Sequence, residues 1–179
     1  NDEGRLLVDA DTPTDEVVAA VKAWIEEHVP VAWRDAADRG GAAAIREVRS
    51  RDDYEAWYPV FGRSGLVAPT WAVEYGGLGL TREHQRAFTA ESAAFDMPFS
   101  LNVPTLGILA ATLVDFGTHE QKLRHLPAIL RGDELWVQFL SEPSGGSDLA
   151  GCLTRADRDG DVYILNGSKI WSSSAYASD

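Results

Sequence analysis

Apolar positions recur with the period of an α-helix through the first 132 residues, and the pattern changes after that point. The first helix is expected to start with Thr12 as its N-cap and Pro13 as its first helical residue, and to end near Pro30. Its apolar residues share one face: Val17, Val18, Val21, Trp24 and Ile25. One side of this helix is therefore predicted to face a core.

The next stretch is less regular. Residues 34–49 show no clear period, and Gly40 and Gly41 are expected to break whatever precedes them. An aromatic helix follows, which should close at Gly62 or Gly65 and be distorted at Pro59. Its pattern comes from four aromatic residues at i, i+3, i+4 and i+7: Tyr54, Trp57, Tyr58 and Phe61.

Three further helices are predicted before residue 133. Thr81 is expected to cap a helix that runs to about Asp96. Residues 104–116 are apolar on almost every side, which predicts a central helix that ends at Gly117.

The last predicted helix starts with a capping box. Thr118 and Gln121 have the spacing at which each side chain bonds the other's backbone N–H. The helix is expected to break or restart at Pro127 and to end at Gly132.

The pattern after Gly132 is that of strands. Residues 135–140 form a short apolar run, which predicts a buried strand. Asp159-Gly160 is a strong hairpin-turn signal before the β-rich residues 162–165, and residues 168–175 are expected to form another strand. The predicted fold class is therefore α+β, with an all-α helical domain over residues 1–132 and an antiparallel β-domain over residues 133–179.

Charge and composition narrow the function classes. The 179 residues carry a formal net charge of -12, which argues against a general nucleic-acid binder. The single cysteine, Cys152, allows no intrachain disulfide, and no apolar run approaches the roughly 18 residues of a membrane span, so a cytoplasmic protein is expected. The four histidines are not spaced for joint metal coordination, and no G-x-S-x-G hydrolase motif is present, so no metal ligand is assigned.

Three short stretches carry candidate chemistry, each with a plainer alternative. "SEPSGGSD", residues 141–148, offers backbone N–H groups and hydroxyls that suit a phosphate, or it is a simple turn capped by Asp148. "KIWSSS", residues 169–174, offers a flat wall beside hydroxyls for an aromatic cofactor, or Trp171 is a half-buried core residue. "EYGGLGLT", residues 74–81, fails as a dinucleotide fingerprint because Arg82 occupies the third glycine position, so a structural loop that opens a helix is the better interpretation.

Taken in order, four stretches resemble the acyl-CoA dehydrogenase family. They are "APTWAVEYGGLGLT", "FGTHEQKLRHLPAILRGDE", "SEPSGGSD" and "DGDVYILNGSKIWSSSA". The last two are similar to the family signatures Thr-Glu-Pro-x-Ala-Gly-Ser-Asp and Asn-Gly-x-Lys-x-Trp-Ile-Thr-Asn. The resemblance covers residues 15–179 and implies an N-terminal helical domain followed by the start of a middle β-domain, which is incomplete here, with the C-terminal helical half absent.

The resemblance also implies an FAD site and its residues. Ser141 is expected to hydrogen-bond near the isoalloxazine ring, and Ser173 to reach its N5 atom. Gly145, Gly146 and Ser147 are expected near the pyrophosphate or the CoA, with Ser147 as a substrate contact. The implied cofactor-binding residues are Gln138, Phe139, Leu140, Ser141, Gly146, Ser147, Trp171, Ser172 and Ser173.

Four positions depart from the family pattern. Ser141 and Ser173 stand where threonine is common, which keeps the hydroxyl but frees its rotamer. Gly145 replaces the usual alanine and adds flexibility, and Gln138 stands where tyrosine is frequent, so that wall is more polar.

The implied reaction is α,β-dehydrogenation of an acyl-CoA thioester to the trans-2-enoyl-CoA. In the family a glutamate removes the α-proton and a hydride passes from the β-carbon to FAD, which electron-transfer flavoprotein then reoxidises. No residue here matches that glutamate, so no catalytic residue is assigned, and the chain alone is expected to bind FAD weakly without turnover. The residues of "APTW" and "SEPSGGSDLAG" also resemble family members that act on steroid side-chain CoA esters. Some of those enzymes are heterotetramers.

Three other interpretations stay open. An acyl-CoA oxidase of the same fold uses oxygen as the electron acceptor. A non-catalytic subunit of a heteromeric dehydrogenase has the fold without the activity. A helical interaction module needs no cofactor at all.

Overall fold

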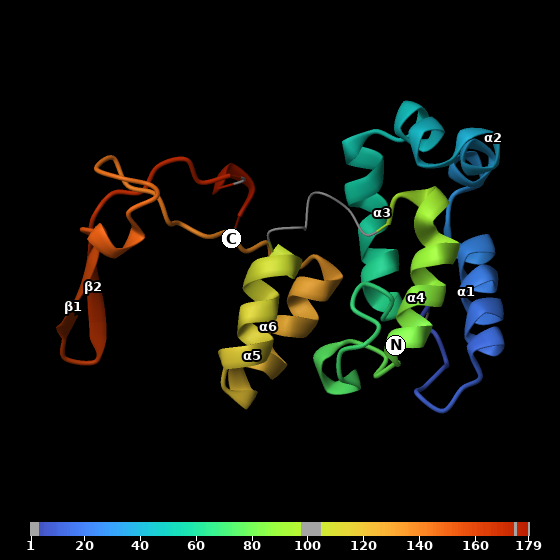
Figure 1. The fold of residues 1–179 in the computed structure, drawn as a ribbon, viewed down its shortest axis with the longest axis horizontal. Helices are drawn as coiled ribbons and strands as arrows, with labels where there is room; N and C mark the ends of the chain where they lie inside the picture. The colour runs from blue at the N-terminus through green and yellow to red at the C-terminus, as the bar shows by residue number, and fades with distance from the viewer. Residues whose placement is uncertain (1–3, 98–104, 174, 179) are drawn as a thin grey trace. The chain divides into compact units, whose positions relative to one another are not determined.

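The computed structural model describes residues 4–97, 105–173 and 175–178. The chain divides into two compact units, unit 1 over Asn1–Glu134 and unit 2 over Leu135–Asp179. Figure 1 shows unit 1 as a set of helices and unit 2 as loops with one two-stranded ribbon.

The first helix of unit 1, α1, spans Thr14–His28 and buries the predicted apolar face. Its start differs from the prediction, because Pro13 is the N-cap and no side chain caps the helix. The Thr12 hydroxyl instead donates to the Asp9 carboxylate at 3.0 Å, and the Thr12 N–H donates to the same oxygen at 3.0 Å. Thr12 therefore closes the preceding turn rather than the helix.

Helix α2, Val31–Val48, contains the predicted break. Gly40 and Gly41 leave helical geometry, and Gly41 has φ 60 and ψ -149, a conformation that side-chain-bearing residues rarely adopt. Trp33 and Ala36 are buried before the kink and Ile45 after it, so both halves contact the interior.

Helix α3, Arg51–Ser64, buries all four predicted aromatic residues. A capping box between Ser50 and Asp53, which the sequence pattern did not reveal, fixes its start. Gly65 in left-handed conformation ends it, so the later of the two predicted closures is correct. The helix continues past Pro59, which is exposed, because water can satisfy the carbonyl that loses its N–H partner.

Helix α4, Arg82–Ser92, is capped by Thr81 as predicted and packs against α1. A 3₁₀ turn, η2 over Ala93–Phe95, extends it to Asp96, which is left-handed with φ 54. The predicted end at about Asp96 is therefore confirmed.

The apolar segment before Gly117 is helical but not central. It starts as a π-helix, η4 over Thr105–Ala110, and continues as α5, Ala111–Phe116; position 104 lies outside the described residues. Ile108 is 45% exposed and Phe116 is 84% exposed. The prediction of a central helix is wrong, because within unit 1 this segment is covered on only part of its circumference, where it packs against α6.

Helix α6, His119–Arg131, has the predicted Thr118–Gln121 capping box and ends at left-handed Gly132. The predicted break at Pro127 is wrong. A proline inside a helix removes one hydrogen bond at a cost of about 3 kcal/mol. Here Leu126, just before the proline, and Ile129, two residues after it, are almost fully buried, which offsets that cost.

The core of unit 1 is rich in aromatic side chains from α1, α2 and α3. The Trp57 ring stacks on Phe61 at 5.7 Å and meets Trp33 edge-on at 5.3 Å. The indole N–H of Trp57 donates to the His28 carbonyl at 2.8 Å, so its polar edge is satisfied. Contacts between aromatic rings therefore pack α1, α2 and α3 against one another.

Unit 2 contains the predicted hairpin. Strands β1, Arg155–Asp159, and β2, Val162–Asn166, pair antiparallel, and Gly160 has φ 62 in the turn between them. Two 3₁₀ turns, η5 over Leu149–Gly151 and η6 over Ala175–Ala177, are the other regular elements among its described residues.

Two predicted strands are wrong. Residues 135–140 are not part of a β-ladder and are half-buried to exposed, and the described residues of 168–175 form loop and the start of η6; position 174 lies outside the description. A strand needs a neighbour that satisfies its backbone groups, and in the described part of unit 2 only β1 and β2 pair along their length. None of the described helices is long and apolar enough to cross a bilayer.

Candidate functional site

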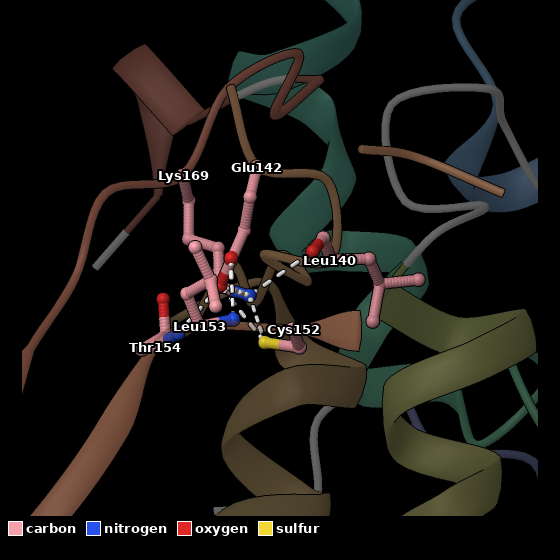
Figure 2. Close-up of polar contacts among 6 residues, drawn as sticks. All are labelled: Leu140, Glu142, Cys152, Leu153, Thr154 and Lys169. Carbon is pink, nitrogen blue, oxygen red and sulfur yellow. Dashed lines mark hydrogen bonds and ion pairs between the residues drawn. The ribbon is translucent and has the colours of Figure 1, made fainter. Parts of the chain in front are cut away.

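The two motifs that the sequence analysis singled out lie side by side in unit 2. The Ile170 N–H donates to the Ser141 carbonyl at 2.9 Å. The Lys169 ammonium donates to the Leu140 carbonyl at 3.0 Å and to Glu142 Oε1 at 2.9 Å. Residues 27 to 29 positions apart along the chain are therefore held in direct contact (Figure 2).

Glu142 is the centre of this contact. Its side chain accepts hydrogen bonds from the Cys152 thiol at 2.8 Å and the Thr154 N–H at 2.8 Å, both to Oε1, while Oε2 accepts the Leu153 N–H at 2.7 Å. With Lys169, four donors converge on one carboxylate, as Figure 2 shows. The residue is 6% exposed, so this charge is buried and compensated.

The electrostatics of the pair follow from these contacts. The pKa of the Glu142 carboxyl lies far below its ordinary value because the Cys152 thiol, then the Thr154 and Leu153 groups and Lys169, bond its charged form, which outweighs burial. The pKa of the Lys169 ammonium is raised by its bonds to Glu142 and Cys152. Both groups are charged over the whole physiological pH range.

The loop after Glu142 is a tight, internally bonded turn. The Glu142 N–H donates to the Gly145 carbonyl at 3.0 Å, and the Gly145 N–H donates back at 3.0 Å. The Asp148 carboxylate accepts the Gly151 N–H at 3.1 Å, which is the capping role that the plainer interpretation gave it. The Gly145 N–H is consumed within the turn, and this leaves Gly146 and Ser147, both exposed, as the outward-facing part of the loop.

The residues before Glu142 present an apolar edge with one hydroxyl. Phe139 is 51% exposed and Leu140 is 48% exposed, whereas Gln138 and Ser141 are half-buried. A Cβ added to Gly146 would lie 3.6 Å from the Ser141 hydroxyl, so the loop folds back over this serine. The pocket beside Leu140 and Glu142 has a volume of about 170 Å³, below the roughly 300 Å³ at which small-molecule pockets begin. It is therefore too small to enclose a ligand by itself.

Trp171 is the most unusual residue of the second stretch. Its side chain is 85% exposed, so the alternative of a half-buried core tryptophan is wrong within this chain. Its φ is 57, in the left-handed region that bulky residues rarely occupy and that is frequent at functional sites. Ser172 is half-buried beside it, and Ser173 is exposed.

This arrangement fits a flat heteroaromatic group. An uncovered indole face and the exposed Phe139 and Leu140 supply apolar contact, while the hydroxyls of Ser141 and Ser173 supply polar contacts for a ring edge. The described residues hold no group of three or more His, Cys, Asp or Glu side chains that suits a metal ion.

Three residues of this site have a role that the sequence patterns did not predict. Cys152 was treated as isolated, and Glu142 and Lys169 were treated only as parts of motifs. The structure shows that all three meet, with the Lys169 ammonium 3.1 Å from the Cys152 sulfur. The available signal was a pair of opposite charges, Glu142 in one motif and Lys169 in the other.

Comparisons with known proteins show the family of this chain. The profile of the acyl-CoA dehydrogenase N-terminal domain matches residues 14–133. The chain is 38% identical over 164 residues to acyl-CoA dehydrogenase IpdE1 of Mycobacterium tuberculosis (strain ATCC 25618 / H37Rv), which covers 92% of this chain and 42% of that protein.

Solved structures show the same relationship. The ChsE4-ChsE5 complex from Mycobacterium tuberculosis matches with a TM-score of 0.62 and 32% identity, covering 97% of this chain and 42% of that one. The Tcur3481-Tcur3483 steroid ACAD matches with a TM-score of 0.60 and 32% identity, covering 96% of this chain and 43% of that one. The chain thus spans less than half the length of these relatives. The predicted fold class, an N-terminal helical domain followed by the start of an antiparallel β-domain, is confirmed.

Proposed function

Because this chain belongs to the acyl-CoA dehydrogenase family, we propose that it forms one side of an FAD site in an enzyme that oxidises acyl-CoA thioesters. The reaction is α,β-dehydrogenation to the trans-2-enoyl-CoA. The observation that carries the proposal is the contact between the two motifs, where the Ile170 N–H bonds the Ser141 carbonyl at 2.9 Å. That contact brings the exposed indole and the hydroxyl-bearing loop into one unit.

Each segment has a separate task in this proposal. Trp171 covers one face of the flavin ring, and Phe139 and Leu140 keep water from its edge. The hydroxyls of Ser141 and Ser173 hydrogen-bond polar atoms of the ring, with Ser172 and Gln138 at its border. When bound, FAD supplies the acceptor for the hydride that leaves the β-carbon.

The loop residues Gly146 and Ser147 face outward and are suited to phosphate oxygens. Gly146 has no side chain to block a close approach, and the Ser147 hydroxyl can donate a hydrogen bond to the cofactor or to the CoA of the substrate. No residue of this chain is assigned the role of the base that removes the α-proton.

A titration with FAD tests the proposal. The 179-residue chain is titrated with FAD while flavin fluorescence is followed, and weak, saturable quenching is expected from stacking on Trp171. Trp171→Ala should weaken binding about tenfold or more, because one aromatic stacking contact contributes about 1–3 kcal/mol. Tyr163→Ala is the matched control, since Tyr163 is 64% exposed on the hairpin and has no assigned contact. Equal affinity of the two variants contradicts the assignment of Trp171.

A heteromeric enzyme acting on steroid CoA esters is the second candidate, in which this chain is either the catalytic or the non-catalytic subunit. It is favoured by the similarity to the ChsE4-ChsE5 complex and to the Tcur3481-Tcur3483 steroid ACAD, each named as a pair of proteins. Flavin bleaching by the full-length protein with a steroid side-chain CoA ester and with butyryl-CoA compares the two substrate classes. Faster bleaching by butyryl-CoA contradicts the steroid candidate.

The electron acceptor and the location complete the proposal. Electron-transfer flavoprotein is the proposed acceptor, and the cytoplasm is the proposed compartment. After anaerobic reduction by substrate, slow reoxidation in air and fast reoxidation by electron-transfer flavoprotein support a dehydrogenase. Fast reoxidation by oxygen supports the oxidase alternative.

A further inference from the structure

We propose that Glu142 and Lys169 are a positioning pair, whose ionic contact sets the spacing between the two segments assigned to FAD, residues 138–147 and 171–173. The inference rests on the proposed function, since it assigns these segments to the cofactor. Neither residue of the pair is assigned a contact with FAD itself. Both act through the residues next to them.

The hydrogen bonds of Glu142 and Lys169 are made to other groups of this chain. Both oxygens of Glu142 are occupied by donors from this chain, three on Oε1 and one on Oε2. The Lys169 ammonium has three protons and three partners, the Leu140 carbonyl, Glu142 Oε1 and the Cys152 sulfur. With its hydrogen-bonding capacity spent on the protein, the pair has little left to offer a ligand.

Chain connectivity carries the effect of the pair to the proposed site. Ser141 directly precedes Glu142, and Trp171 follows Lys169 by two residues. Consecutive Cα atoms stay about 3.8 Å apart, so a shift of either charged residue is expected to displace its functional neighbour as well. The Ile170 N–H bond to the Ser141 carbonyl lies between these points and reports directly on their spacing.

Among the described residues of unit 2, no other ion pair joins two distant segments of the chain. Glu142 is the only buried residue there, so no apolar core holds residues 138–147 against residues 169–173. The other ion pair in the described part of unit 2, Arg155 with Asp157 at 2.8 Å, is largely exposed and joins residues two positions apart. It cannot fix distant segments and is therefore the matched control.

The test compares four variants of the 179-residue chain: Glu142→Gln, Lys169→Met, Lys169→Arg and Arg155→Met. Amide hydrogen exchange is measured at Ile170, Leu153 and Thr154, and FAD affinity and the shape of the bound flavin's visible absorption band are measured in parallel. Exchange at the hairpin amides of β1 and β2 shows whether a variant is still folded.

Lys169→Met and Glu142→Gln are expected to speed exchange at Ile170 and to weaken FAD binding, each at least about tenfold, because a hydrogen bond to a charged group is lost. The flavin band should also change shape, since the ring is held differently. Lys169→Arg keeps the charge and should restore both readouts to within about threefold of wild type. Arg155→Met should match wild type.

The outcomes separate this inference from the proposed function. If the variants bind FAD like wild type and Ile170 exchanges at the wild-type rate, the positioning role is wrong although the FAD site stands. If wild type does not bind FAD but exchange speeds up as expected, the proposed function fails and the pair still sets the spacing of the segments. Equal losses in Lys169→Arg and Lys169→Met show that charge is not what positions them, which also overturns the inference.

Discussion

Each of the two units of this chain is stabilised by a different kind of interaction. Unit 1 buries a continuous apolar cluster drawn from its helices and the loops between them, with Val17, Phe61 and Leu66 at zero exposure. Among the described residues of unit 2 no hydrophobic side chain is buried, and the single buried residue is the charged Glu142. One unit is stabilised by the removal of apolar surface from water, and the other by hydrogen bonds to a charge.

This difference explains where the candidate chemistry lies. Unit 2 exposes Phe139, Leu140 and Trp171 at the place where its loops meet. Exposed apolar side chains beside a fixed polar centre are typical of a binding surface. The comparison therefore predicts that mutations in unit 1 change stability, and that mutations in unit 2 change binding.

The largest expected effect comes from truncating a core ring. Phe61→Ala should lower the free energy of unfolding of unit 1 by about 3–5 kcal/mol, because it removes a fully buried ring and leaves a cavity. Phe139→Ala in unit 2 makes the same chemical change at a half-exposed site and should cost less than about 1 kcal/mol. Urea unfolding followed by tryptophan fluorescence measures both. Equal costs contradict the contrast between the units.

A smaller effect is expected from adding one methyl group between helices. A Cβ at Gly62 would lie 2.6 Å from the Arg131 Cα and 2.8 Å from the Leu130 carbonyl oxygen, so Gly62→Ala forces α3 away from α6. The cost should be about 1–3 kcal/mol, which is typical of overpacking. Gly107→Ala is the control, because its Cβ meets nothing within 4 Å. If Gly62→Ala and Gly107→Ala have the same thermal-unfolding midpoint, α3 and α6 can move apart without loss of stability, and the prediction is wrong.

The same contrast explains how far the sequence predicts the structure. The α+β class and most helix ends follow from local signals such as the Thr81 and Thr118 caps and the glycine at 132. The expectations at Pro127 and at residues 135–140 failed because burial and strand pairing depend on residues far away in the chain. For the same reason, the motifs supplied candidate residues for the site, but they could not show that Glu142, Cys152 and Lys169 meet.

A charged residue that is buried in unit 1 should contribute to the stability of that unit. Arg49 is stacked over Trp33 at 5.1 Å and Tyr54 at 5.0 Å, and its side chain is 4% exposed. Arg49→Met should cost about 1–2 kcal/mol, because a desolvated cation–π contact is lost while the aliphatic stem is kept.

Arg46 is the matched control for Arg49, because it also pairs with Asp96 but is 65% exposed. Arg46→Met should leave urea unfolding unchanged, as is usual for surface pairs. If both variants lose the same stability, the ion pairs with Asp96 and not the aromatic stacking hold Arg49 in place.

The smallest expected effect is the response of unit 2 to mild acid. A carboxyl whose folded pKa is depressed contributes stability that is fully present above its unfolded pKa, about 4.3 for glutamate, and that is lost progressively as the pH falls from there through the folded pKa. The pKa of Glu142 is depressed by the Cys152 thiol and its other donors. The amide ¹⁵N shifts of Leu153 and Thr154 should therefore stay constant from pH 7 to about 4.3 and change only at clearly lower pH. In Glu142→Gln these amides should show no such transition, because the glutamine side chain does not titrate. A transition near pH 4.3 in wild type means that the carboxylate has no net stabilisation from its donors, and the contrast between an apolar unit and a charge-centred unit then fails.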